Sequence, residues 1–186
     1  VKEILLSDVG YMQGMSGNGL TTEKGNENSW VDISVMAVPA NFFSFMNIPI
    51  EQGRLPQTEK DIVVDNVWQE MQKKDVIGMN LYSGNTDYTI CGISAPFQAN
   101  VYNRSSGYAF LPYDPSVYIG HCYIKSHPGQ QKEVARWIEK VYREMLPENI
   151  TYQAKTFLND IHVLQALEYN LKDIILFFAV ISIIIT

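Results

Sequence analysis

The sequence has few charged residues and no concentration of positive charge, and these shortages exclude one class of partner. Charged residues make up 18% of the 186 residues, below the roughly 25% that is usual in globular domains. The net charge of −6 repels phosphate backbones, and no cluster of lysine and arginine offers a local exception. Nucleic acid is therefore not expected as a partner.

Catalytic and metal-binding patterns are also missing. The histidines His121, His127 and His162 are too scattered in the sequence to form a metal-binding or catalytic cluster. No Gly-x-Ser-x-Gly turn offers a serine nucleophile. Asp61 and Asp65 flank an apolar segment, and a turn residue and a helix cap explain them more simply than an acid–base pair does. We therefore expect no catalytic residue, no metal site and no cofactor.

Cysteine is scarce, and its two positions leave the redox compartment open. Cys91 and Cys122 each lie in an apolar run that predicts a strand. Buried free thiols are common at such positions, and a disulfide between the two residues is the alternative.

Two polar loops interrupt the apolar pattern. Residues 10–29 are rich in glycine and asparagine but lack the Lys-Ser/Thr pair of a phosphate-binding loop, so they predict a mobile loop or hairpin tip. Residues 96–107 form the second loop, which contains Phe97, Tyr102 and Arg104. Aromatic and arginine side chains are favoured as interface anchors. A partner contact there is one interpretation, and an ordinary solvated loop is the other.

The clearest folded element is a strand-helix-strand pattern in the second half of the chain. Residues 121–125 and 150–155 predict strands, and Pro147 ends the helix between them. Because apolar residues recur in that helix at intervals of three and four, one face is expected to lie against a core. This unit favours an α/β fold with helices against one sheet. The apolar residues are Val134, Trp137, Ile138, Val141, Tyr142 and Met145.

The C-terminal residues are the most apolar part of the sequence. Residues 174–186 contain no charge, glycine or proline, and ten of them are Leu, Ile, Val or Phe. Ten such residues contribute roughly −3 to −6 kcal/mol towards membrane insertion. A buried core helix is the alternative, but such a helix normally keeps a polar face. We therefore expect these residues to be the first part of a transmembrane helix.

The segment before this apolar stretch predicts a stalk. Residues 159–173 have an apolar stripe at helical spacing, and no glycine or proline interrupts residues 159–186. The two segments can therefore form one continuous helix that transmits motion. The residues expected to couple the stalk to the rest of the protein are Leu164, Leu167, Tyr169 and Leu171.

Several segments of the chain together carry a family resemblance. The first is residues 38–54, VPANFFSFMNIPIEQGR, and the others follow in order over most of residues 30–186. This ordered series resembles the periplasmic core domain of MacB-like and FtsX-like ABC transporter permeases. The later segments are residues 61–66, 77–81, 88–93 and 110–112, and the apolar helix from Ile174.

The resemblance implies a two-lobed α/β (α+β) domain on the periplasmic side of the cell inner membrane. Residues 1–52 and 112–158 would form a membrane-proximal lobe with the strand-helix-strand unit. Residues 53–111 would form an inserted, mainly β lobe. Residues 159–173 would be the stalk helix, and residues 174–186 would begin the transmembrane helix.

The resemblance also implies a non-catalytic role in transport. The domain would couple ATP hydrolysis in the cytoplasm to a conformational change outside, for export or for handling of lipoproteins. Its partners would be a cytoplasmic ABC ATPase subunit or domain, a second permease copy in a dimer, the membrane, and an extracytoplasmic adaptor or lipoprotein.

The alternative is a ligand-binding extracytoplasmic sensor domain of a membrane receptor kinase, because alternating strands and a C-terminal membrane helix suit it too. Two further transmembrane helices after Thr186 would indicate a permease. One helix followed by a cytoplasmic kinase would indicate a sensor.

Overall fold

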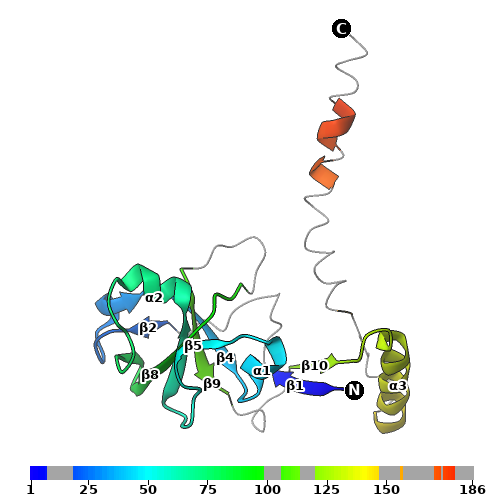
Figure 1. Ribbon diagram of the computed structural model, residues 1–186, viewed down its shortest axis with the longest axis horizontal. Coiled ribbons are helices and arrows are strands. Elements are labelled where there is room, and N and C mark those ends of the chain that lie inside the picture. Colours follow the sequence, from blue (N-terminus) through cyan, green and yellow to red (C-terminus); the bar gives the residue numbers. More distant parts are fainter. Residues whose placement is uncertain are drawn as a thin grey trace. The chain divides into compact units, whose positions relative to one another are not determined.

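The structure is a computed structural model in which two compact units can be described (Figure 1). The units are Val1–Gln130 and Gln131–Thr186, and each is described by itself. The described residues are 1–7, 19–98, 106–113, 120–146, 156, 170–172 and 174–178.

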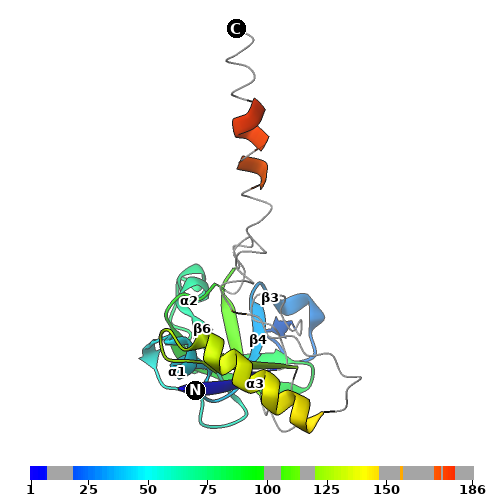
Figure 2. The ribbon, with the colours of Figure 1, turned by 90° about the vertical axis from the view of Figure 1, so that its right-hand side faces the viewer.

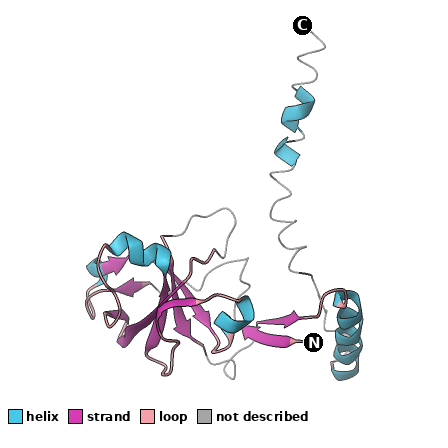
Figure 3. Cartoon of the chain, in the orientation of Figure 1, coloured by secondary structure: helices cyan, strands magenta, loops and turns pink. Residues whose placement is uncertain are grey.

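Most of the first unit is one curved sheet, which we call the main sheet (Figure 3). Among the described residues it has eight strands, in the order β3-β2-β7-β8-β6-β9-β4, with β5 paired to β8. The strands at the two ends of this order, β3 and β4, are separated by only two residues of the chain. Those residues span at most roughly 11 Å, so the sheet must curl back on itself. The strands are β2 (Leu20–Thr21), β3 (Trp30–Val31), β4 (Ser34–Val38), β5 (Ile50–Gly53), β6 (Asp61–Asp65), β7 (Asn80–Ser83), β8 (Thr86–Ser94) and β9 (Tyr108–Pro112).

The main sheet has buried side chains on both of its faces. In β6, Val63 belongs to one core cluster, whereas Ile62 and Val64 belong to the other, and none of the three is exposed to solvent. The strand pairs in parallel with β8 and antiparallel with β9. A strand buried on both faces needs a continuous apolar run instead of alternation, which explains the Ile-Val-Val sequence.

Two short helices flank the main sheet, and the sequence predicted both. The sequence predicts that a short helix after Pro39 buries Phe42, Phe45 and Met46. In α1 (Phe42–Met46), Phe42 and Phe45 are buried, Phe43 is buried with them, and Met46 is only partly buried. The helix ends at Asn47, which adopts the left-handed conformation with φ 55°. The buried aromatic side chains of α1 are part of the first core cluster, and they attach the helix to it.

The second helix, α2 (Asn66–Gln72), confirms one predicted role and contradicts another. Asp65 caps it, because the carboxylate accepts a hydrogen bond of 3.0 Å from the backbone nitrogen of Trp68. The sequence predicts that Trp68 and Met71, three residues apart, share the buried face of this helix. Trp68 is buried, but Met71 is 52% exposed. Met71 lies in the last turn, past the turn that carries Trp68 into the core.

A separate two-stranded sheet, which we call the small sheet, pairs β1 (Glu3–Ser7) with β10 (His121–Lys125) in antiparallel fashion. Leu5 lies on its inner face and is fully buried in the first core cluster. Ile4 lies on the opposite face and is 48% exposed.

The topology differs from the predicted organisation in two places. The main sheet crosses the lobe boundary predicted at residue 53, because β4 and most of β5 precede that residue and pair with β9 and β8, which follow it. Within the predicted loop 10–29, residues 20–21 form β2 and residues 27–29 form the 3₁₀ helix η1 (Glu27–Ser29). The division into a membrane-proximal lobe and an inserted lobe stays a prediction.

In the second unit, α3 (Gln131–Met145) matches the predicted helix (Figure 2). The expectation that its apolar stripe faces a core is not met, because no residue of α3 is buried and Trp137 is 57% exposed. The strand predicted at residues 150–155, which would complete the strand-helix-strand unit, lies outside the described residues.

The C-terminal residues that can be described are helical. They are residues 170–172 and 174–178, and Leu171 and Phe178 are 57% and 61% exposed. Within the part of the chain that the structure describes, no helix is both long and apolar enough to cross a membrane. The other expected coupling residues and the end of the predicted transmembrane helix lie outside it, namely Leu164, Leu167, Tyr169 and residues 179–186.

Candidate functional site

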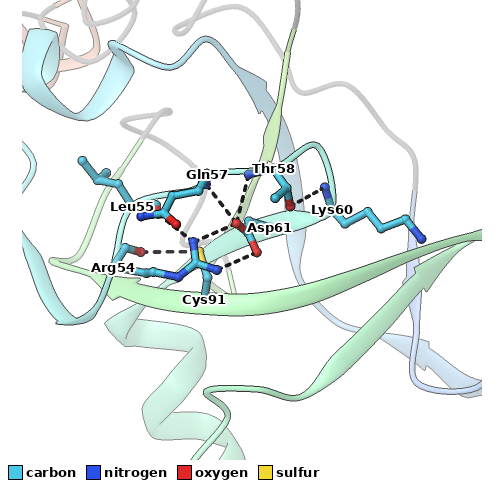
Figure 4. A network of polar contacts seen from close by, with 7 residues as sticks. All are labelled: Arg54, Leu55, Gln57, Thr58, Lys60, Asp61 and Cys91. Carbon is cyan, nitrogen blue, oxygen red and sulfur yellow. Dashed lines mark hydrogen bonds and ion pairs between the residues drawn. The ribbon is translucent and has the colours of Figure 1, made fainter.

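The connection between β5 and β6 is organised around one buried carboxylate (Figure 4). Asp61 is only 6% exposed. Its Oδ2 and Oδ1 accept hydrogen bonds of 2.7 and 3.0 Å from the two terminal nitrogens of Arg54. Oδ2 also accepts hydrogen bonds from the backbone nitrogens of Gln57 and Thr58, at 2.9 and 3.0 Å. A buried charge needs such partners to offset its loss of water, so the loop and the carboxylate stabilise each other.

The charge of this network is fixed by its geometry. The hydrogen bonds from Arg54, which exceed the opposing effect of burial, hold the pKa of Asp61 well below its usual range. Asp61 therefore stays ionised at neutral pH and is poorly suited to exchange protons.

Cys91 packs against the same loop. Its thiol donates a hydrogen bond of 3.4 Å to the backbone oxygen of Arg54, whose own nitrogen donates to the Cys91 carbonyl at 2.9 Å. Burial raises the pKa of the Cys91 thiol. A side chain at Gly53 would place its Cβ 2.3 Å from the Cys91 oxygen, and Gly53 has φ +74°, so this close approach requires glycine.

The structure answers the question left open for the cysteines. Cys91 and Cys122 are both free thiols. Cys91 is buried, as the sequence predicts, whereas Cys122 is exposed on the outer face of the small sheet. The expectation that both thiols are buried is therefore wrong for Cys122. Only one face of the small sheet packs against the core, and Cys122 lies on the other face.

A shallow groove of about 620 Å³ lies between the end of α1 and β5, next to the Arg54–Asp61 network. Its lining includes the apolar residues Phe43, Ile48 and Ile50, with Asn47 and Arg54 as polar members. Arg54 is already engaged with Asp61. The groove can contact an apolar surface. Its lining contains no Asp, Glu, His or Cys, and its one hydroxyl group, that of Ser44, donates a hydrogen bond of 2.9 Å to the backbone oxygen of Asn41.

The partner-contact residues predicted in the second polar loop do not form one described patch. Phe97 is half-buried, and its ring packs edge-on against Phe42, Tyr108 and Phe110, with centroids 5.5 to 5.8 Å apart. This geometry favours a packing role over a protruding anchor. Tyr102 and Arg104 lie outside the described residues.

Among the described residues, the remaining candidates for metal binding or catalysis have structural roles. No group of three or more His, Cys, Asp or Glu side chains there is placed to hold a metal ion. Burial raises the pKa of Asp65, which opposes the lowering effect of the hydrogen bond from Trp68. Asp61 and Asp65 therefore stabilise a loop and a helix end, in agreement with the simpler interpretation of the sequence.

Two functional arrangements escaped the sequence analysis. Arg54 lies in the segment that carried the resemblance, but the sequence analysis did not pair it with Asp61. Lys125 is likewise unremarkable in the sequence, although its ammonium group reaches α1 in the structure. A favourable charge pair seven residues apart was the only available signal for the first arrangement.

Solved structures share this arrangement of strands. No protein-family model and no curated protein sequence matches the chain. The periplasmic region of MacB from Actinobacillus actinomycetemcomitans matches with a TM-score of 0.52 and 13% identity, over 76% of this chain and 65% of that chain. The chain has a MacB-like fold. The predicted mixed α/β class and the predicted likeness to the MacB periplasmic fold are therefore confirmed, whereas the two lobes and the stalk helix stay predictions.

Two further structures with the MacB-like fold come from other bacteria. A permease domain from Porphyromonas gingivalis matches with a TM-score of 0.52 and 14% identity, over 82% of this chain and 84% of that chain. The extracellular domain of the ABC-type transporter YknZ from Gram-positive bacteria matches with a TM-score of 0.52 and 10% identity, over 77% of each chain. Identities this low establish the fold and transfer no residue roles.

Proposed function

We propose that this chain is the extracytoplasmic domain of an ABC transporter permease of the MacB and FtsX type. The observation that supports the proposal is the MacB-like fold, which is shared with three transporter or permease domains over at least 76% of this chain. In this proposal the domain lies on the periplasmic side of the inner membrane. Its partners are a cytoplasmic ABC ATPase, a second permease copy and an extracytoplasmic adaptor or lipoprotein.

The domain acts by transmitting motion, without catalysing a reaction. ATP hydrolysis in the cytoplasm moves the transmembrane helices, and the predicted stalk at residues 159–173 carries that movement outwards. A helix suits this task because its backbone hydrogen bonds keep it stiff along its length. The folded part then rearranges against its partners during export or lipoprotein handling.

The chemistry of the described residues supports a mechanical role. The buried carboxylate of Asp61 is saturated by the loop that it organises, and that of Asp65 caps α2. Neither lines the groove beside β5. The charges inside the domain thus stabilise its shape, which a body that transmits force requires.

The experiment is to break the stalk in the full-length permease with its ATPase in lipid nanodiscs. A spin label replaces Asn85, in the turn between β7 and β8, in each copy of the dimer. We expect the distance between the two labels to change when ATP is trapped. Tyr169→Pro costs about 3 kcal/mol or more in a helix and should abolish the change while ATPase activity persists.

Tyr169→Ala, which preserves the helix, is the matched control and should behave like the wild type. If the distance in the wild type never responds to nucleotide, the domain transmits no motion and the proposal is wrong. If Tyr169→Pro responds normally, motion reaches the domain by a route other than the stalk.

A further inference from the structure

All covalent connections between the main sheet and the two ends of the chain run through the small sheet. The main sheet occupies residues 20–112. The chain enters it after β1 and leaves it before β10, and these two strands pair with each other. A movement that arrives along the chain from either end must therefore pass through β1 or β10 to reach the main sheet.

Non-covalent contacts between the two sheets converge on α1, which Figure 1 shows beside β1. Leu5 of β1 is fully buried in the same core cluster as the aromatic side chains of α1. At the start of the helix, the side-chain amide of Asn41 donates a hydrogen bond of 2.9 Å to the backbone oxygen of Ile4. The small sheet is thus held against α1 by both apolar and polar contacts.

Lys125, the last residue of β10, makes the most extensive of these contacts. Its ammonium group donates a hydrogen bond to the backbone oxygen of Phe45. The same nitrogen lies 5.0 Å from the centre of the Phe45 ring and 3.8 Å from Oε2 of Glu3. A lysine whose cation meets a carbonyl, an aromatic face and a carboxylate is held in one orientation.

The position of this contact along the strands is informative. Glu3 and Lys125 are directly opposite each other in the register of β1 and β10, at the end of the small sheet nearest the chain termini. Glu3 also faces α1, because the hydroxyl of Ser44 lies 3.5 Å from its Oε1. The polar contacts therefore attach the small sheet to α1 at the point where the chain enters and leaves the domain.

We infer that Lys125 is a coupling residue that makes the small sheet and the main sheet move as one body. Force that enters at Glu3 or Lys125 passes directly to the last turn of α1. From there it reaches the core through Phe42, Phe43 and Phe45. The inference rests on the proposed function and assigns part of it to named residues.

The test uses the full-length permease with its ATPase in nanodiscs, and measures rigidity within one copy. Spin labels replace Asn85, on the main sheet, and His127, which is exposed just after β10. In the wild type we expect one narrow distance distribution that is the same with and without trapped ATP. Lys125→Met keeps the apolar stem but removes the ammonium group, and it should broaden that distribution.

Lys74→Met is the matched control, because it removes the same charge from an exposed residue between α2 and β7 and should leave the distribution narrow. If Lys125→Met proves too unstable to measure, Asn41→Ala removes another polar link between α1 and the small sheet, at an exposed position, and should also broaden the distribution. A narrow distribution in the variant that is measured, or a broad one in the wild type, would overturn the inference.

The experiment separates this inference from the proposed function. A distribution that broadens in Lys125→Met supports the coupling contact, whatever the two copies do. A distance between the two copies that never responds to ATP would contradict only the proposed transmission of motion. If the copies respond to ATP normally and Lys125→Met stays narrow, transmission stands and the coupling contact fails.

Discussion

The main sheet and the small sheet are built from similar apolar strands, yet they bury their side chains differently. In β6 the consecutive residues Ile62, Val63 and Val64 are all fully buried, since both faces of the strand are covered. In β1, Leu5 is fully buried while its neighbour Ile4 is half exposed. The main sheet is therefore stabilised by its own core, whereas the small sheet depends on what it touches along one face.

The largest expected effect is on the core of the main sheet. Phe110 is fully buried, and its ring contacts Phe42, Phe43 and Phe97. Phe110→Ala should lower the free energy of unfolding by about 3–5 kcal/mol, because it leaves a cavity in a close-packed cluster. Urea denaturation measures the loss. A loss below about 1 kcal/mol would show that this cluster is loosely packed.

The next effect concerns the close approach of β5 to β8. Gly53→Ala combines a left-handed backbone with a clash against the Cys91 carbonyl, and should cost about 2–3 kcal/mol. Gly78→Ala is the matched control, since Gly78 also has positive φ (+80°) but nothing within 4 Å of the added carbon. It should cost only about 1 kcal/mol. Equal losses in urea denaturation would mean that the β5–β8 contact yields easily.

A third prediction uses acid to weaken the loop before β6. The pKa of Asp61 is lower in the folded protein than in the unfolded chain. Its contribution to stability is therefore complete above the unfolded pKa of about 4, and it is lost as the pH falls below that value. Between pH 5 and pH 2 the free energy of unfolding should fall more steeply for the wild type than for Asp61→Asn. The difference between the two slopes should correspond to the uptake of at most one proton.

Measuring the free energy of unfolding across that pH range tests the prediction. Asp87→Asn is the comparison, since Asp87 makes a more exposed ion pair with Lys60 and should change the slope less. Parallel curves for the wild type and Asp61→Asn would show that the Arg54–Asp61 pair is not maintained in solution.

The smallest effect is expected on the outer face of the small sheet. Ile4→Ser should cost less than about 1 kcal/mol, because Ile4 is 48% exposed. The same urea titration compares it with Phe110→Ala. A loss as large as that of the core variant would show that this face is covered in solution, and the contrast between the two sheets would disappear.

Local features of the sequence predicted much of this structure. The apolar run after Asp61 and the helical spacing before Pro147 each gave the correct element, whereas the alternation in residues 31–38 predicted one strand that the structure divides between β3 and β4. Asp65 was identified as a cap because its side chain acts on its own helix only three residues away.

Features that depend on distant partners were missed. The parallel pairing of β4 with β9 joins residues about 74 positions apart, such as Ser34 and Tyr108, and no local pattern specifies it. The main sheet crosses the boundary predicted at residue 53 through these distant pairings. Phe97 was one candidate for a partner contact, and its polar neighbours in the sequence gave no sign of its packing against β9. The contacts of Lys125 depend on how α1 lies against the small sheet.

The brevity of β3 has a consequence for association between copies. Because β3 contains only Trp30 and Val31, this border of the main sheet exposes too few unpaired backbone groups to template strand addition by a neighbouring chain. At the opposite border, Val35, Met36 and Val38 of β4 are buried. A neighbouring molecule that meets the β3 border therefore contacts side chains and does not extend the sheet.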